Sequence, residues 1–410
     1  MNMIAAIAWK NIWRNRARSL VVLISIALGM TGGIFSAAVM QGTSNQRLRE
    51  AISRETANLQ IHHPDYPEDK DVRFFFHADS NALATFLDTT PAVRSWSPRI
   101  RFMAMASSAA AGSGVMVSGV DPEMEKRVTD LSSLIPDSTG TWFGDGKGVP
   151  VVIGASLAKK LKVRLRSKIV LTFQEMHGEL SGAAFRITGI YRTNNSVFDE
   201  MNIFVTREAI IPLLGAEPGT VHEIAIRLRD EKSSDILKTN LKTKFPELLT
   251  RDWKELDPIL GMMHNLLDLW LYLFMGIILL ALGFGIVNTM LMSIMERTRE
   301  LGMLAAIGMN RRRIFTMIMF ESVFLSLTGG LAGMALSIGL ISWTGHTGIY
   351  LGSFSVGFEK MGYSSMLYPS LDALFFINIT LMVIFTGIVA SIYPARRALR
   401  LNPALAIRNE

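Results

Sequence analysis

Four long apolar runs dominate the sequence, and each is long enough to cross a lipid bilayer as a helix. A hydrocarbon core of ~30 Å needs about 20 helical residues at a rise of ~1.5 Å each. The third run contains only one charged residue, Glu321, and the fourth is expected to end at Pro394 because proline interrupts a helix. The predicted spans are residues 19–41, 269–295, 314–343 and 373–393.

Composition places the chain among membrane proteins and excludes several kinds of chemistry. Hydrophobic residues make up 49% of the sequence, which is too apolar for an ordinary soluble protein. The absence of cysteine excludes disulfides, thiolate metal sites and cysteine nucleophiles. The histidines show no zinc-binding spacing, and neither a Walker A pattern nor a GxSxG serine motif occurs. We therefore expect no catalytic residues, no metal site and no cofactor bound by this chain.

Basic residues cluster beside the predicted spans, and this decides which side each cluster faces. Short loops rich in arginine and lysine stay in the cytoplasm. The net charge of +7 is therefore a sign of topology and gives no support to nucleic-acid binding. We expect a multi-pass protein of the bacterial cell inner membrane. Three segments are predicted to be cytoplasmic, residues 1–18, 296–313 and 394–410, with basic residues that include Arg14, Arg18, Arg297, Arg299, Arg311, Arg312, Arg313, Arg396, Arg397, Arg400 and Arg408.

The segment before the first span, residues 1–18, alternates apolar and basic side chains. Trp9 and Trp13 are interspersed with basic residues such as Arg14, a pattern typical of a short helix lying in the membrane interface. A basic flank with aromatic anchors is an equally good interpretation and predicts the same topology. A secretory signal peptide is a third interpretation, but the apolar run of residues 19–41 exceeds the usual length of roughly 7–15 residues.

Between the first two spans, residues 42–265 carry the mixed signals of an α+β domain on the opposite, periplasmic side. Asp257 and Pro258 suit the N-cap and first position of a helix that continues into the second span, so we expect helical stalks. A shorter extracytoplasmic loop, residues 344–372, is expected between the last two spans. Alternating or β-branched runs predict strands at residues 58–62, 72–76, 115–120, 169–173, 185–191 and 222–228. Helical patterns occur at residues 155–161, 207–214 and 233–244.

The cytoplasmic segment between the second and third spans, residues 296–313, predicts a compact surface helix. It consists of good helix formers and ends at Gly308, which suits a left-handed C-cap. Its charged start is followed by a partly apolar knob that another protein can hold in a groove. On these residues alone an ordinary charged loop helix is an equally good interpretation. The knob consists of Leu301, Leu304 and Ile307 with the small residues Gly302, Ala305 and Ala306.

This segment resembles the hallmark of the FtsX-like permeases of type VII ABC transporters, R-x-R-E-[IL]-G-x-x-x-A-[IL]-G. In that family the segment is the coupling helix that docks on the ATPase subunit, so the resemblance implies the same role here. The resemblance continues through WKNIWRNRARS, SGVDPE, IGASLAKKL and YPARRALRLNPALAIR. Residues 162–168 depart from the family pattern, because relatives often carry a Gly-Asp pair there. The matching residues are Arg297, Arg299, Glu300, Leu301, Gly302, Ala306, Ile307 and Gly308.

Three positions inside the predicted spans are further candidates. Glu321 lies about two turns into the third span, where a carboxylate costs free energy unless it is paired. We interpret it as a joint between helices, paired with Arg311–Arg313 or with the cytoplasmic end of another span, in preference to a substrate site. Gly29 and Gly33 form a GxxxG pattern that allows close helix packing. The resemblance implies in addition that the first two spans face a partner subunit and a cavity open to the outer leaflet.

The resemblance also implies a fold class and a function. The fold class is an α-helical membrane protein with four transmembrane helices and an α+β, MacB-like periplasmic domain inserted between the first two. The function is a permease subunit of the mechanotransmission type, whose partners are a separate ABC ATPase dimer that binds ATP and magnesium and a second permease chain, identical or different. The size of the domain is similar to that of the lipoprotein-releasing permeases and of the MacB-type exporters. Because the latter carry their ATPase in the same chain, we expect extraction of lipoproteins, with a lipoprotein client and a periplasmic chaperone as further partners. A signalling scaffold for a cell-wall hydrolase and MacB-like efflux stay open as alternatives.

Overall fold

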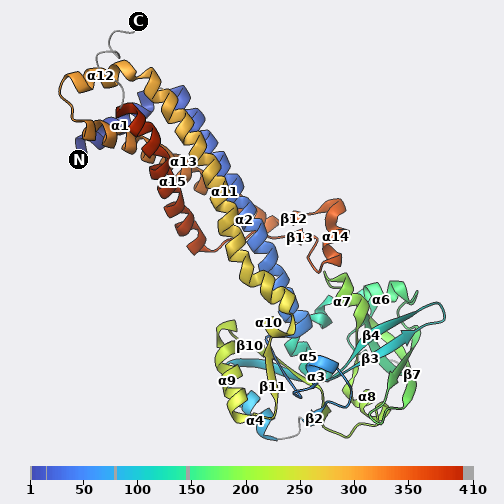
Figure 1. Cartoon of the computed structure of the whole chain (residues 1–410). Helices are drawn as coiled ribbons and strands as arrows, with labels where there is room; N and C mark the ends of the chain where they lie inside the picture. The colour runs from blue at the N-terminus through green and yellow to red at the C-terminus, as the bar shows by residue number, and fades with distance from the viewer. Residues whose placement is uncertain (1, 15, 78–80, 145–147, 400–410) are drawn as a thin grey trace. The chain divides into compact units, whose positions relative to one another are not determined.

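The computed structural model describes residues 2–14, 16–77, 81–144 and 148–399, and the chain divides into two compact units (Figure 1). The helical unit falls within residues 1–43, 265–349 and 367–410. The sheet domain falls within residues 44–264 and 350–366. Arg400 and Arg408, two of the basic residues predicted in the cytoplasmic tail, lie outside the described residues.

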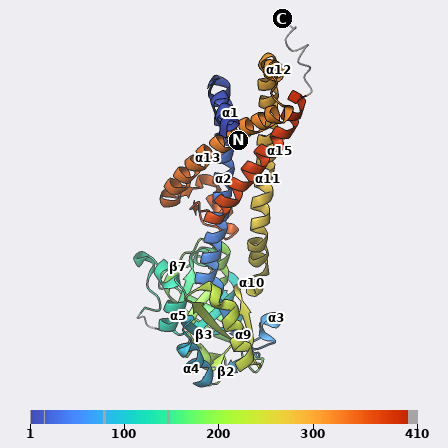
Figure 2. The same cartoon turned by 90° about the vertical axis from the view of Figure 1, so that its left-hand side faces the viewer.

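The helical unit is built from long apolar helices and two short ones. Within the described residues, four helices are long and apolar enough to cross a membrane, which confirms this part of the predicted fold class. The short helices α1 and α12 lie at the same end of the helical unit in both views (Figures 1 and 2). The bounds are α1 (Asn2–Arg14), α2 (Arg16–Ala51), α11 (Pro258–Glu296), α12 (Thr298–Ala306), α13 (Arg311–Thr347) and α15 (Ala373–Leu399).

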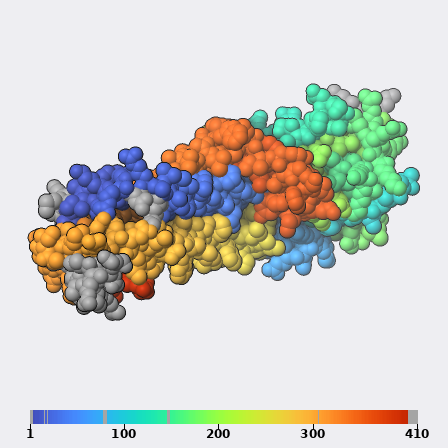
Figure 3. All heavy atoms as spheres, turned by 90° about the horizontal axis from the view of Figure 1, so that it is seen from above, coloured from blue at the N-terminus to red at the C-terminus, as the bar shows by residue number. Residues whose placement is uncertain are grey.

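Packing in the helical unit depends on small residues as much as on large apolar ones. Met30, Ile34 and Met275 are fully buried between the helices. A Cβ atom on Gly333 would lie 2.7 Å from the carbonyl oxygen of Ala27, so glycine allows α13 to approach α2 closely. The space-filling view shows α2 running alongside α11 (Figure 3). Many outward side chains are large and apolar, as lipid-facing helices require.

The last long helix departs from the prediction at its end. Pro394 is predicted to terminate the span, but α15 continues through it to Leu399. Proline removes one backbone hydrogen bond, here to the carbonyl of Ala390, and strains the preceding turn. Pro394, Ala395 and Ala398 are all buried, so packing against neighbouring helices keeps the last turns helical.

Nine strands of the sheet domain form one sheet in the order β11-β1-β10-β3-β4-β8-β5-β7-β6. Strand β6 also pairs with β3, so six strands from β3 to β6 in this order close into a ring. The pairs β4–β8 and β5–β7 are parallel, and the other pairs are antiparallel. The bounds are β1 (Leu59–His62), β3 (Val93–Ser107), β4 (Gly112–Val120), β5 (Val149–Gly154), β6 (Lys168–Gln174), β7 (Leu180–Tyr191), β8 (Asn202–Thr206), β10 (Glu223–Leu228) and β11 (Leu249–Asp252).

The two largest apolar cores among the described residues of the sheet domain lie on different parts of the sheet. One lies inside the closed ring, where Phe102, Phe185 and Ile153 pack against residues of α6 (Ala155–Lys160) and α8 (Arg207–Leu213). The other lies between β1 and β10 on one side and α4 (Asn81–Thr89) and α9 (Ser234–Lys244) on the other. The remaining short elements are α3 (Tyr66–Asp69), α5 (Pro122–Val128), α7 (Ser196–Met201), α10 (Trp253–Leu256), α14 (Ser355–Lys360), β2 (Phe76–His77), β9 (Thr220–Val221), β12 (Ile349–Tyr350) and β13 (Met366–Leu367).

Most predicted elements of the sheet domain coincide with observed ones. The helices predicted at residues 155–161, 207–214 and 233–244 correspond to α6, α8 and α9. The strand predicted at residues 72–76 is wrong, because the backbone turns after Asp71. The predicted strands at residues 58–62, 115–120, 169–173, 185–191 and 222–228 correspond to β1, β4, β6, β7 and β10.

The turn after Asp71 has a local cause. The Asp71 carboxylate accepts a hydrogen bond from the Arg73 backbone N–H at 2.9 Å, and the Asp71 carbonyl accepts one from the Phe74 N–H. Such side-chain bonds to the backbone compete with extended structure. Only Phe76 of the predicted segment therefore belongs to a strand.

The segment that departs from the family pattern, residues 162–168, forms the turn between α6 and β6 without any glycine. Lys162 and Arg166 adopt φ angles of 52° and 68°. This left-handed conformation costs an ordinary residue about 1–2 kcal/mol. The Arg166 N–H donates to the Ile187 carbonyl at 2.9 Å, so backbone hydrogen bonds hold the turn.

Candidate coupling site

Glu321 is buried in α13 and is bound by residues from two other segments. The Arg297 guanidinium donates to both of its carboxylate oxygens, at 3.1 and 3.2 Å. Asn11 of α1 donates to the carboxylate at 2.6 Å. A buried carboxylate needs such partners, since desolvation alone would cost several kcal/mol. Glu321 is therefore a joint of three segments, and its ionic partner is the residue after α11, one of the two alternatives that the sequence allowed.

A second carboxylate extends this cluster toward the surface. Glu300 of α12 forms an ion pair with Arg14 of α1, and it accepts a hydrogen bond from Arg297 at 3.2 Å. Partial desolvation opposes ionisation of Glu300, but the hydrogen bonds from Arg14 and Arg297 lower its pKa below the ordinary value. The acid is therefore ionised at neutral pH. One arginine, Arg297, thus links the short cytoplasmic helix to a buried residue of α13.

These residues line a polar pocket of about 310 Å³ at this end of the helical unit. Its walls come from α1, α2, α11, α12 and α13. A polar, partly open pocket gives charged side chains room and water in which to change partners. The lining residues include Asn11, Arg14, Ser293, Glu296, Arg297, Glu300 and Glu321.

Helix α12 ends in a Schellman motif. Gly308 has a φ angle of 97°, and the Met309 N–H donates to the Leu304 carbonyl at 3.0 Å. The prediction of a left-handed cap at Gly308 is confirmed. The motif places Ile307 at the tip of the segment, where 85% of its surface is exposed. An exposed isoleucine beside a rigid turn can insert into an apolar groove of another protein.

The residues of the sequence motif divide into an inward and an outward group. Leu301 and Gly302 are buried against the helical unit, so Leu301 is not part of the exposed knob. Arg297 is directed inward to Glu321. The outward group is formed by Arg299, Met303, Ala306, Ile307 and Gly308. Whether this group contacts an ATPase stays a prediction.

Asn11 and Arg14 are part of the cluster, and the sequence interpretation missed them in this role. They lie three residues apart and therefore share one face of α1. Ala8 and Ile12 of the same helix are buried against the helical unit. The sequence did contain one indication of such partners. Glu321 is a lone carboxylate within a predicted span, so it needs polar partners from elsewhere in the chain.

Gly29 and Gly33 bring α2 close to α11 of the same chain. A Cβ atom on Gly29 would lie 3.0 Å from a methyl carbon of Leu282, and one on Gly33 would lie 2.8 Å from a methyl carbon of Ile278. An apolar groove of about 610 Å³ follows these glycines between the two helices. The groove is lined mainly by aliphatic side chains, so it suits an apolar chain better than a solute.

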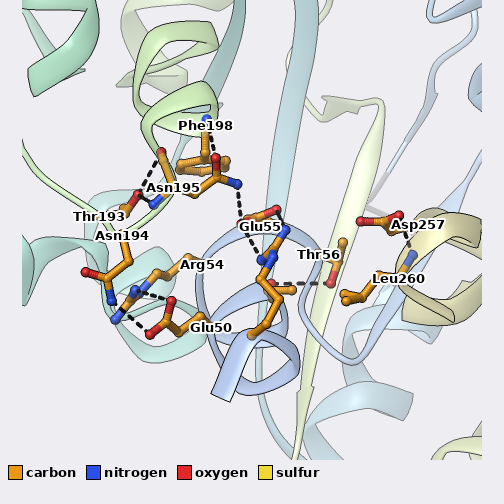
Figure 4. A network of polar contacts seen from close by, with 12 residues as sticks. Glu50, Arg54, Glu55, Thr56, Thr193, Asn194, Asn195, Phe198, Asp257 and Leu260 are labelled. Atoms are coloured by element: carbon orange, nitrogen blue, oxygen red, sulfur yellow. Dashed lines mark hydrogen bonds and ion pairs between the residues drawn. The ribbon is translucent and has the colours of Figure 1, made fainter. Parts of the chain in front are cut away.

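Within the sheet domain, the end of α2 is held by a second polar network (Figure 4). The last turn is a π-helix, Ile52–Thr56, whose Glu55 accepts hydrogen bonds from Arg47 at 2.9 Å and from Asn195 at 3.1 Å. Asp257 caps α11 by accepting from the Leu260 N–H at 3.0 Å, which confirms the predicted helix start.

The segment between α13 and α15 packs on this network. Ser196 of α7 donates to the Glu359 carbonyl at 3.2 Å, and Arg192 lies 3.8 Å from the Glu359 carboxylate. A Cβ atom on Gly362 would lie 3.0 Å from the Arg47 side chain. Residues 350–366 therefore belong to the sheet domain, although the chain reaches them from a spanning helix.

Comparisons with known proteins match both parts of the chain. A model described as MacB-like periplasmic core domain matches residues 19–244, and one described as FtsX-like permease C-terminal matches residues 272–403. The macrolide export ATP-binding/permease protein MacB of Escherichia coli is 26% identical over 435 residues, which cover 98% of this chain and 60% of that protein.

Two further matches are of the same kind. The pyoverdine export ATP-binding/permease protein PvdT of Pseudomonas syringae pv. tomato is 24% identical over 427 residues, covering 98% of this chain and 59% of that protein. The periplasmic region of MacB from Actinobacillus actinomycetemcomitans has a TM-score of 0.33 at 12% identity and covers 54% of this chain and 98% of that one. The chain spans about 60% of the length of the curated relatives named here.

Proposed function

Because the chain belongs to the FtsX-like permeases that carry a MacB-like periplasmic core domain, we propose that it is the membrane subunit of an ABC transporter of the mechanotransmission type. A dimeric ABC ATPase, expected as a separate subunit, binds ATP and magnesium and docks on α12. A second permease chain completes the assembly. The observation that carries this proposal is the Arg14–Glu300–Arg297–Glu321 cluster, which ties an exposed docking helix to a spanning helix.

The mechanism follows from the connections of α12. When the ATPase closes on ATP, it pushes Ile307 and the outward group, and Arg297 carries the displacement to Glu321 of α13. Helices α2 and α11 each begin in one unit and end in the other. A displacement of these helices therefore reaches the periplasmic domain. No solute pore is needed, since the energy moves the domain and the lining of the groove.

We propose that the client is amphipathic and leaves the outer leaflet of the inner membrane, with a lipoprotein as the first candidate. The aliphatic groove between α2 and α11 supports an acyl-chain client, and a periplasmic chaperone is then expected to receive it. MacB-like efflux is the second candidate. It is favoured by the relatives named for macrolide and pyoverdine export.

The decisive experiment is ATPase activity of the chain in lipid nanodiscs with its candidate ATPase. We compare wild type with Ile307→Asp and Glu300→Arg, and use Glu208→Arg, an exposed acid of α8, as the matched control. We expect the ATPase to lose its stimulation in both α12 variants, because Ile307 forms the knob and Glu300 anchors it, and to keep it in the control. Equal activity in all four proteins would contradict docking through α12.

The same assay distinguishes the clients. A lipidated lipoprotein that stimulates the ATPase, with its unlipidated form inactive, supports extraction. A macrolide that stimulates it alone supports efflux. If no client changes the ATPase activity but the α12 variants still lose stimulation, the docking proposal holds and both client proposals fail. The scaffold for a cell-wall hydrolase is then the remaining alternative.

A further inference from the structure

A polar pocket lies on the face of the main sheet that is opposite the α4–α9 core. In β1 the side chains of Gln60 and His62 point to this face, and both are buried. The strand register sets Arg251 of β11 beside Gln60 and Glu223 of β10 beside His62. It then sets Arg99 of β3 beside Glu223. Adjacent strands therefore contribute a continuous row of polar side chains to one buried surface.

The acids of this surface are already compensated inside the protein. Glu223 accepts from Arg99 at 2.6 Å and from Arg101 at 2.8 Å, and Arg99 also pairs with Glu125. Glu55, at the rim of the pocket, is bound by Arg47. Asp257 is engaged at the start of α11, where the helix dipole favours a negative charge.

The basic side chains that line the pocket have fewer partners than its acids. Within the described residues, the side chains of Lys70 and Arg251 make no hydrogen bond or ion pair, yet both line the pocket. The buried Nε of Arg101 also lacks a partner among the described residues. His62 adds no charge, since burial lowers its pKa to about 4. The lining thus has three cations and three acids, but the acids are engaged within the protein while Lys70 and Arg251 stay available to a bound anion.

The pocket has a cavity volume of about 340 Å³, and part of its wall is apolar. Tyr66, Met116, Phe198 and Leu256 face the same space as the cations. We propose that this pocket of the periplasmic domain binds a small organic anion, a carboxylate or phosphate ester with an aromatic or aliphatic body. The guanidinium groups of Arg101 and Arg251 receive the anionic group, and the apolar wall receives the body.

The position of the pocket gives such a ligand access to the parts of the domain that continue into α2 and α11. Glu55 and Thr56 of the π-helix that ends α2 line it, and so do Leu256 and Asp257 before α11. Figure 4 shows Glu55, Thr56 and Asp257. Short π-helical segments occur often at functional sites. A bound anion therefore touches the domain ends of α2 and α11, and this holds whichever client the transporter moves.

The chain contains no cysteine, so a single introduced thiol reports on the pocket. We place it with Met116→Cys in the full chain in nanodiscs, and use Ala109→Cys in the exposed β3–β4 turn as the reference. The probes are anionic sulfonatoethyl methanethiosulfonate and cationic trimethylammonioethyl methanethiosulfonate. We expect the anionic reagent to be favoured about fivefold at the pocket thiol relative to the reference thiol, because Lys70 and Arg251 line the pocket without a partner among the described residues.

Charge and ligand variants complete the test. Combined with Met116→Cys, Arg251→Gln should lower the preference for the anionic reagent about threefold, whereas Arg164→Gln, an exposed arginine outside the pocket, should leave it unchanged. Benzoate or phenyl phosphate should slow labelling of the pocket thiol, and neutral benzamide should not.

The proposal is overturned if the two reagents react at the same ratio at both thiols, if Arg251→Gln behaves as Arg164→Gln, or if benzamide protects as well as benzoate. A pocket thiol that stays unreactive in a folded protein shows a closed space and overturns it too. If Met116→Cys fails to fold, Leu256→Cys at another lining position replaces it.

Discussion

Two charge clusters in this chain have similar composition and opposite surroundings. In the sheet domain, Arg99, Glu125 and Glu223 are nearly inaccessible, with exposed side-chain fractions of 4%, 0% and 1%. In the helical unit, the pair Arg14–Glu300 is exposed by 56% and 38%. The first cluster has no water to replace a lost partner, and the second has water at hand. Burial thus makes the first cluster a fixed part of the fold, and exposure leaves the Arg14–Glu300 pair free to exchange partners.

The largest effect is expected when the buried cluster is broken. Arg99→Leu leaves Glu125 without its arginine and Glu223 with only Arg101, so the free energy of unfolding should fall by about 3–5 kcal/mol. Urea unfolding of the purified chain in detergent, followed by tryptophan fluorescence, measures it. Arg164→Leu on the exposed turn is the matched control and should change stability by less than about 0.5 kcal/mol. If the free energy of unfolding falls as little as in the control, the buried cluster contributes no more to stability than an exposed one.

Asp199 sharpens the comparison, because it is a buried carboxylate without a cation bound to it. Burial raises its pKa from 3.8 to about 7, despite hydrogen bonds from the Thr193 N–H and hydroxyl. The folded state thus holds a proton that the unfolded state releases, so this residue's contribution to stability is complete below about pH 4 and is lost as the pH rises through 7.

Asp199→Asn should therefore stabilise the chain at pH 8 by on the order of 2 kcal/mol, and the gain should shrink toward pH 5. Thermal unfolding across this pH range measures it. A variant that is less stable than wild type at pH 8 would show that the ionised carboxylate is needed, which contradicts the assigned role of burial.

The smallest effect is expected at the cluster of the helical unit. A double-mutant cycle with Arg14→Gln and Glu300→Gln should give a coupling energy of about 0.5 kcal/mol, because both side chains are exposed and each can turn to water when its partner is neutral. Detergent thermal unfolding of the four proteins supplies it. A coupling above about 3 kcal/mol would make this pair as fixed as Arg99–Glu125, and its role as a movable joint would be lost.

The sequence predicted those parts of the fold that depend on local patterns. Uncharged runs indicated the four spans, and alternation indicated strands such as β6 and β7. Strand β3 was missed because its first half carries Arg94, Arg99 and Arg101, which look exposed. Arg99 forms ion pairs with Glu125 and Glu223, and Arg101 forms one with Glu223. Both acids are distant in the chain. Nonlocal pairing of this kind leaves no periodic signal.

The candidate site was predictable to a similar extent. The helix formers of residues 296–313 predicted α12 and its cap at Gly308, and the lone carboxylate in the third span predicted that Glu321 needs a partner. The sequence could not show that Arg297 is directed inward or that Leu301 is buried, because both depend on how α1 and α13 pack beside α12. The anion pocket had no local signal at all, since its cations come from separate segments that only the strand register brings together.

The ring closure of the sheet has a consequence for biogenesis. A domain that folds after export can associate wrongly with its neighbours through unpaired strand edges. Here β6 is paired on both sides, and within the described part of the main sheet the free edge is that of β11 alone. That edge is four residues long and carries Arg251 and Asp252. Short, charged edges resist cross-β aggregation, so the crowded periplasmic side meets a domain with little surface for polymerisation.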